Sequence, residues 1–283
     1  SRPAYTETEN ELTVKANKRT FIFSKKDGQL KGVSVDNRKI SFANGPRFIG
    51  ARRADRSLDQ FYNHDDEKAK EKDRTYSEFP DAAVFTKLDV KEDGGNLVVT
   101  ANYKLGNLDK TQWTINPSGE LALDYTYNFS GVVDLMGIRF DYPEDQVISK
   151  RWLGAGPYRV WQNRIHGTQY DVWENDYNDP ISGETFTYPE FKGYFGDVSW
   201  MNIQTKEGTI SLTNETPDAY IGVYQPRDGR DRLLYTLPES GISVLNVIPP
   251  VRNKVNSTDL CGPSSQPKWV NGPQTGRVIF RFM

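Results

Sequence analysis

Apolar residues recur at every second position in several stretches of this chain. In residues 121–129 the odd positions are apolar, while the even positions carry mostly polar residues such as Asp124 and Asn128. This period predicts a β-strand with one face toward a core and the other toward water or a ligand. Residues 97–105 and 278–282 repeat it. The apolar positions are Leu121, Leu123, Tyr125, Tyr127, Phe129, Leu97, Val99, Ala101, Tyr103, Leu105, Val278, Phe280 and Phe282.

Turn residues fall between the apolar stretches and predict hairpins in a long antiparallel β protein. Helical periodicity is nearly absent, and only Ser57–Arg74 is compatible with a short surface helix or a loop. Two long loops are expected, at residues 151–195 and 249–273, where binding tends to occur on a rigid sandwich. The predicted turns are Asp27-Gly28, Asp93-Gly94-Gly95, Asn116-Pro117-Ser118-Gly119, Glu207-Gly208 and Asp228-Gly229.

The chain of 283 residues is predicted to form one domain. Residues 1–10 are polar and lack apolar periodicity, so they are expected to be a tag remnant or a linker. Residues 11–283 then form a single β domain, because no repeat, low-complexity tract or Pro/Ser-rich linker divides them. If the chain is a module of a larger protein, its location stays open, with the bacterial periplasm or the exterior favoured over the cytoplasm.

Charge and cysteine content narrow the classes of partner. The chain has 36 Lys and Arg against 38 Asp and Glu, spread along its length, for a formal net charge of −2. This distribution has no basic patch for nucleic acid, and the longest apolar runs are too short to span a bilayer. The single cysteine, Cys261, excludes an internal disulfide and a cysteine-based metal cluster. No cofactor and no metal site are predicted.

Residues 151–194 combine aromatic and charged side chains in a way that suits sugar. A pyranose offers an apolar C–H face for an indole and a rim of hydroxyls for paired donors and acceptors. Trp161, Arg164 and Trp173 are the candidate contacts in this stretch, either to a carbohydrate or to a neighbouring domain. The alternative is that these aromatic residues pack in the interior and that the arginine pairs with a nearby acid, which is the preferred interpretation.

Evidence for catalysis within the chain is weak. A glycosidase needs two opposed carboxylates, and the acids between Glu174 and Glu190 also suit an ordinary loop. The two histidines, His64 and His166, are far apart in sequence and lack zinc-ligand spacing. The Gly154–Pro157 stretch is expected to be a tight turn, because Pro157 removes an amide that a phosphate loop would use. No catalytic residue is therefore predicted.

Four motifs together resemble the C-terminal domain of the large family 2 β-galactosidases. The family's Trp-x-Gly-x-Gly-Pro signature, followed by an aromatic residue and an arginine, is matched by residues 152–159. Residues 45–55, which read GPRFIGARRAD, are similar to the segment that carries an Arg-Ala-Pro motif. Residues 188–193 are similar to an aromatic-Pro-x-x-x-Gly step, and residues 244–246 to the final strands.

The chain also departs from the family's pattern at three points. Asp55 follows Arg-Ala where the family prefers Pro, and Glu190 comes one position early after Pro189. Val244 stands where the family places a Trp that reaches the sugar site. Recognition of the aglycone is therefore expected to differ, which fits a subgroup acting on another β-glycoside.

The resemblance implies a two-layer antiparallel β supersandwich of the galactose-mutarotase type. It also implies an accessory role in a glycoside hydrolase whose catalytic glutamates belong to a separate (β/α)₈ barrel. This chain would pack on that barrel and close one wall of the pocket, with Asn246, Arg252 and Asn253 in the loop that reaches the active site. Its partners would be a β-galactoside or related glycan and the other domains of the parent enzyme, and an oligomer is left open.

Two further classes of function remain as alternatives. One is a freestanding carbohydrate-binding domain, which requires sugar affinity from the isolated chain. The other is an aldose 1-epimerase on the same fold, which needs two pocket histidines and a base. Asn63-His64 is followed by two aspartates rather than by that family's aromatic residue, which argues against the epimerase.

Overall fold

The computed structural model describes residues 1–53, 76–176, 193–223, 237–250 and 262–283. Strands dominate these residues, and every pairing between named strands is antiparallel. The described helical segments are the 3-10 turns Glu144–Gln146 and Pro263–Ser265. Among these residues, no helix has the length and apolar character needed to cross a membrane. The prediction of an all-β antiparallel fold is confirmed.

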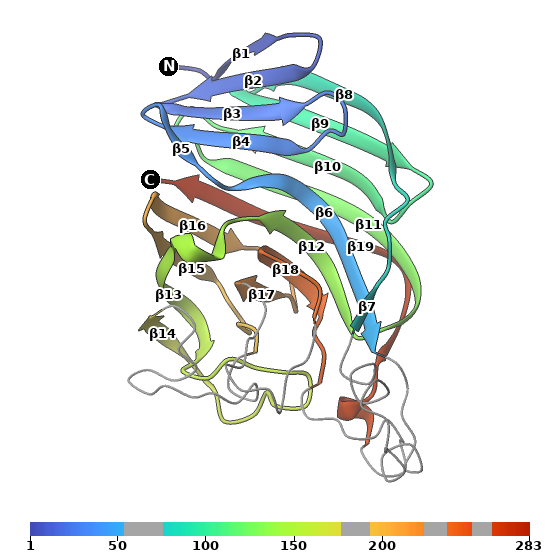
Figure 1. The fold of residues 1–283 in the computed structure, drawn as a ribbon. Coiled ribbons are helices and arrows are strands. Elements are labelled where there is room, and N and C mark those ends of the chain that lie inside the picture. The colour runs from blue at the N-terminus through green and yellow to red at the C-terminus, as the bar shows by residue number, and fades with distance from the viewer. Residues whose placement is uncertain (54–75, 177–192, 224–236, 251–261) are drawn as a thin grey trace.

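One layer is a ten-stranded sheet built mainly from the first half of the chain (Figure 1). Two short strands, β5 (Arg38–Ile40) and β7 (Tyr76–Glu78), pair with β4 and β6 respectively. The other eight follow in the order β1 (Ala4–Glu7), β2 (Glu11–Ala16), β3 (Arg19–Ser24), β4 (Leu30–Val35), β6 (Ala43–Arg53), β12 (Leu135–Asp141), β18 (Ile242–Val247) and β17 (Tyr220–Val223).

The second layer has nine strands, and the strand that is last in sequence lies inside it. This strand, β19, pairs with β16 on one side and with β11 on the other. The order is β14 (Gln169–Asp176), β13 (Val147–Gly156), β15 (Trp200–Thr205), β16 (Gly208–Asn214), β19 (Lys268–Phe282), β11 (Leu121–Val133), β10 (Leu108–Ile115), β9 (Asn96–Lys104) and β8 (Val84–Asp93).

The main core lies between the two layers and follows the predicted alternation closely. Leu121, Leu123, Tyr125 and Tyr127 are buried in it, and so are the predicted apolar positions of β19. Leu105 is an exception, because β9 ends at Lys104 and Leu105 occupies the following turn with φ 71° and 82% exposure. The predicted alternation therefore extends one residue too far, because the turn at Leu105 ends the strand.

The predicted hairpin turns agree with the strand ends that the structure describes. Gly94 and Gly95 connect β8 to β9, where Asp93 pairs with Asn96, and both glycines have positive φ. Such a two-residue turn favours glycine because a side chain is strained in that conformation. The turn at Asp228-Gly229 and the segment Ser57–Arg74 lie outside the described residues.

The two predicted long loops are wrong in part. Residues 151–156 belong to β13, and residues 169–176 form β14, which pairs with β13 as a hairpin. Gly154-Ala155-Gly156 is therefore the end of a strand and not a tight turn. Gly156 leaves room for the indole of Trp173, since a Cβ there would lie 2.7 Å from Trp173 Nε1. Strand β19 begins at Lys268, inside the second predicted loop.

The division into a linker of residues 1–10 and a domain of residues 11–283 stays a prediction. Within the first segment, Ala4–Glu7 forms β1 and pairs with residues 12–15 of β2. All four residues of β1 are exposed, so this strand contributes ladder hydrogen bonds to the edge of the sheet rather than side chains to the core.

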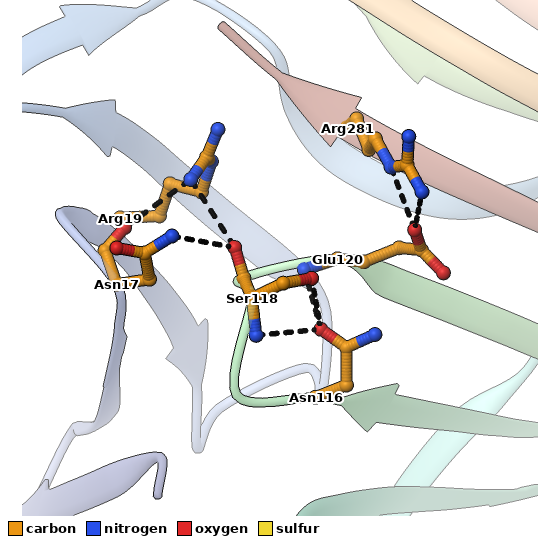
Figure 2. Close-up of polar contacts among 6 residues, drawn as sticks. All are labelled: Asn17, Arg19, Asn116, Ser118, Glu120 and Arg281. Carbon is orange, nitrogen blue, oxygen red and sulfur yellow. Dashed lines mark hydrogen bonds and ion pairs between the residues drawn. The ribbon is translucent and has the colours of Figure 1, made fainter. Parts of the chain in front are cut away.

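A polar clasp joins the two sheets where the β2–β3 turn meets the end of β19 (Figure 2). The Arg19 Nε atom donates to the carbonyl oxygen of Phe282 at 2.8 Å, and its Nη1 donates to the carbonyls of Asn17 and Ser118 at 3.2 Å. Hydrogen bonds from a guanidinium to carbonyls are stronger than neutral ones, so one side chain ties three distant segments together.

The turn that accepts these bonds is fixed by its own hydrogen bonds. Asn116 Oδ1 accepts from the N–H and the hydroxyl of Ser118 and from the N–H of Glu120, which is an Asx-turn arrangement. Glu120 Oε2 in turn accepts from Arg281 Nε at 2.6 Å and from its Nη2 at 2.5 Å. The turn therefore bonds to side chains of both β3 and β19.

Glu207 makes a second link between the sheets from the β15–β16 turn. Its carboxylate accepts from the N–H and hydroxyl of Ser41 at 2.9 and 2.7 Å and from Tyr142 Oη at 2.9 Å. Partial burial raises the pKa of Glu207, but the hydrogen bonds from Ser41 and Tyr142 outweigh it and hold the pKa below the ordinary value of 4.5. The ionised form is therefore stabilised by folding.

Glu207→Gln is expected to lower the free energy of unfolding at pH 7 by about 1 kcal/mol. Because folding depresses the pKa of Glu207, its contribution is present above the unfolded pKa and is lost as the pH falls through the folded pKa. The difference between wild type and variant in urea unfolding should thus shrink below pH 4.5. Glu92→Gln on the exposed face of β8 serves as the control. A pH-independent difference would contradict the assignment.

Candidate functional site

The outer face of the ten-stranded sheet carries a second apolar cluster, separate from the main core. Along β6, β12 and β18, residues such as Phe48, Ile138 and Val244 point into the main core, while their sequence neighbours point outward. The strands supply Ile49, Ala51, Leu135 and Leu245 to the outer cluster, and the segments that cover it supply Val160, Trp161 and Tyr194.

Trp161 is buried within this outer cluster. Only 1% of its surface is exposed, and its ring meets that of Tyr194 edge to face at 5.6 Å and 83°. Main-chain bonds hold this pair, since Val160 N–H donates to the Tyr194 carbonyl at 2.7 Å and Tyr194 N–H donates back at 2.8 Å. The Trp161 indole, a candidate sugar contact from the sequence, is therefore covered by the protein itself.

Arg164 and Trp173 lie in different surroundings from Trp161. Arg164 is exposed, and its N–H donates to the Trp161 carbonyl at 2.9 Å in a tight turn. Trp173 is half-buried on β14, where its Nε1 donates to the Gln169 carbonyl at 3.0 Å and its indole packs against the main core. The structure joins Trp161 and Arg164 through the turn, and places Trp173 in the other sheet.

Asn246 is the fourth predicted residue that the structure describes, and its side chain links the two sheets. Its Oδ1 atom accepts a hydrogen bond from Tyr127 Oη of β11. Burial raises the pKa of Tyr127 above its ordinary value, so this hydroxyl stays protonated and donates. Arg252 and Asn253 lie outside the described residues. The roles given to all six residues stay predictions.

Two buried charged residues at the end of β6 lie beside the outer cluster. Arg53 and Asp134 are each 4% exposed, and the Arg53 N–H donates to Asp134 Oδ2 at 2.8 Å. Tyr76 of the outer cluster pairs with Arg53 across β6 and β7. Sequence reasoning noted Arg53 only as part of the motif at residues 45–55. An arginine and an aspartate at the ends of apolar strands were the signal that could have marked them.

The outer cluster contains two buried tyrosines, Tyr76 and Tyr194. Burial raises the pKa of Tyr194, with a smaller contribution from Tyr76, so its hydroxyl stays protonated. Within the part of the chain that the structure describes, no group of three His, Cys, Asp or Glu side chains is placed to hold a metal. His166 is exposed in the turn after Arg164, and His64 lies outside the described residues. The face therefore presents packed aromatic rings beside two buried charged residues.

This architecture is a galactose mutarotase-like β sandwich. Galactose 1-epimerase from Lactobacillus acidophilus NCFM superposes with a TM-score of 0.52 at 10% identity, over 100% of this chain and 99% of that chain. A galactose mutarotase-like protein from Clostridium acetobutylicum has a TM-score of 0.44 at 9% identity, over 99% and 98%. A GalM/aldose epimerase homologue from C. elegans has 0.41 at 8%, over 99% of each chain.

Within this fold, the chain belongs to the β-galactosidase small chain family, whose model matches residues 15–254. The match spans all four motifs that carry the resemblance, and it covers both sheets except for β1, the start of β2 and β19. The suspected relationship is thus confirmed at the level of the family. A search among curated protein sequences finds no relative of this chain.

Proposed function

We propose that this chain is the non-catalytic module of a β-galactosidase-like glycoside hydrolase. It packs on the catalytic barrel of the parent enzyme and helps to shape the carbohydrate site. The observation that carries the proposal is the match to the β-galactosidase small chain family over residues 15–254. The burial of Trp161 supports it, because a covered indole acts through packing and not through a sugar ring.

The outer cluster is what makes the module suitable for this role. Its aromatic rings and main-chain bonds fix the turn at Trp161–Arg164 on the sheet, so the exposed Arg164 is held at a defined place. Binding energy is lost when loops must be ordered on association, and a preformed surface avoids that loss. Among the residues that the structure describes, Arg164 is therefore the candidate for contact with another domain or with the glycan.

Reconstitution tests the proposal. The 283-residue chain is mixed with separately produced catalytic domains encoded by the same locus, and complex formation is followed by sedimentation while hydrolysis of nitrophenyl β-galactoside is recorded. We expect hydrolysis from the mixture and none from the chain alone. Arg164→Ala should weaken the complex, whereas Arg38→Ala on the exposed edge strand β5 should not.

Three outcomes would reject the accessory role. Hydrolysis by the isolated chain would place the catalytic residues within it. Mutarotation of galactose above the buffer rate by the isolated chain would favour the epimerase alternative. Failure of the mixture to form a complex, with both parts folded, would leave the freestanding carbohydrate-binding domain as the better hypothesis.

A further inference from the structure

Two surface hollows share two arginines of the ten-stranded sheet, and none of the four predicted site residues that the structure describes lines either hollow. The larger has a volume of about 730 Å³ and lies at the start of β6 and the end of β12. The smaller has about 430 Å³ and lies between the β3–β4 turn and the β7–β8 connection. Arg47 and Arg139 line both, and they pair directly across β6 and β12. We call the combined surface the Arg47–Arg139 groove.

The two arginines are held rigidly by the groove's own residues. Arg47 Nε donates to the Asn44 carbonyl at 2.9 Å, and its Nη2 pairs with Asp141 Oδ1. Asn44 Nδ2 donates to the other oxygen of Asp141 at 2.9 Å. Arg139 Nη2 pairs with Glu78 Oε1 at 2.8 Å, while its buried Nε has no hydrogen-bond partner within the described residues. The guanidinium groups are thus fixed in place, and the unsatisfied Nε of Arg139 lies below the surface of the groove.

The charges that line the groove cancel. In the larger hollow Lys39, Arg47 and Arg139 face Asp141, Glu144 and Glu239. In the smaller one Lys26, Arg47 and Arg139 face Asp27, Glu78 and Asp81. A phosphate or another anion gains no net attraction from such a surface, and neither does a cation. A neutral ligand with many hydroxyls can use both the donors and the carboxylate acceptors.

The smaller hollow adds an apolar wall. Phe85 and Tyr103 meet at 5.9 Å and 61°, and Tyr103 Oη donates to the Asp27 carbonyl at 2.6 Å, which fixes the ring. Phe79 lines the same hollow and stacks on Phe129 at 5.4 Å. A pyranose needs this combination, with flat apolar area under its C–H face and polar groups at its rim.

We propose that the Arg47–Arg139 groove binds a neutral oligosaccharide. One ring covers Phe85 and Tyr103, and the hydroxyls of the next ring reach Arg47 and the Asn44–Asp141 pair. Each hollow falls within the roughly 300–1,000 Å³ typical of small-ligand sites. The choice of a saccharide among neutral polyols rests on the proposed function. The groove goes beyond that function, because it gives the chain a glycan site of its own.

Calorimetry on the isolated chain tests the groove. The probes are lactose and a neutral β-1,4-galactotetraose, with tetragalacturonate as the anionic counterpart. We expect binding of galactotetraose, with Arg47→Gln and Phe85→Ala each weakening it by about tenfold or more. Arg277→Gln is the control, since Arg277 is likewise a strand arginine in ion pairs, with Asp124 at 2.5 Å and Glu215 at 3.0 Å, but lies on the other sheet. Thermal unfolding of each variant confirms that it is folded.

Several results would overturn the inference. One is no binding of either neutral saccharide by the wild-type chain, and another is tighter binding of tetragalacturonate. Wild-type affinity in folded Arg47→Gln and Phe85→Ala variants would place the glycan elsewhere. The readout is independent of reconstitution with the catalytic domains: loss of the groove leaves the accessory role standing, and failure of reconstitution leaves the groove standing.

Discussion

Trp161→Ala is expected to lower the free energy of unfolding of the chain by about 3–5 kcal/mol, because it leaves a cavity in the outer cluster. The indole is 1% exposed and packs edge to face on Tyr194, so its loss removes both buried area and an aromatic pair. Urea unfolding followed by circular dichroism measures the change. In the reconstituted enzyme, the Michaelis constant should stay unchanged under conditions where the variant is folded.

Trp269→Ala is the matched control for this substitution. Trp269 lies at the start of β19 with 74% of its surface exposed, so its removal should change stability by no more than about 0.5 kcal/mol. A Trp161→Ala variant of wild-type stability and raised Michaelis constant would reverse the interpretation. Trp161 would then contact the sugar after a movement of the turn at residues 161–164 that exposes its indole.

Gly137→Ala is expected to destabilise the fold by about 3 kcal/mol or to prevent folding. A Cβ at residue 137 would lie 2.7 Å from Leu245 Cα and closer still to the Val244 carbonyl oxygen. Both atoms belong to the backbone of β18, so relief requires β12 and β18 to separate beneath the outer cluster. Expression level and the midpoint of thermal unfolding report the effect.

Gly32→Ala provides the comparison within a strand of the same sheet. There the nearest atom to a new Cβ is Ile22 Cδ1 at 3.6 Å, an ordinary contact. The variant should be as stable as wild type or slightly more stable, because alanine restricts the unfolded chain. If both variants behaved alike, close approach of β12 and β18 would not be the reason for glycine at residue 137.

The alternation of apolar and polar residues was sufficient to predict the strands that face the main core. Burial in these strands follows from the local sequence alone. Strand β11 and the end of β19 show this, with tyrosines and phenylalanines inward and Asp124 and Arg277 paired outside. The glycines at residues 154 and 156 led to a wrong prediction of a turn, because the need for glycine there comes from residues that are distant in sequence. Gly156 makes space for Trp173, a contact that depends on the β13–β14 pairing and leaves no local signal.

The candidate site residues show the same contrast between what the local sequence indicates and what only strand pairing reveals. Trp161 and Trp173 are prominent in sequence, but composition does not distinguish an indole that covers a sheet from one that faces a ligand. Arg47 and Arg139 were not singled out, because each looks like an ordinary charged residue in its own strand. Only the pairing of β6 with β12 places them side by side over the groove.

The position of β19 has a consequence for how the protein is made. Strands β8–β11 and β13–β16 form two separate halves of a sheet until β19 fills the space between them. Both β11 and β16 therefore expose unpaired backbone during synthesis, until residues 268–282 have left the ribosome. Completion of this sheet therefore waits for β19, and nascent chains that stall before residue 268 carry two open strand edges that can pair with other chains.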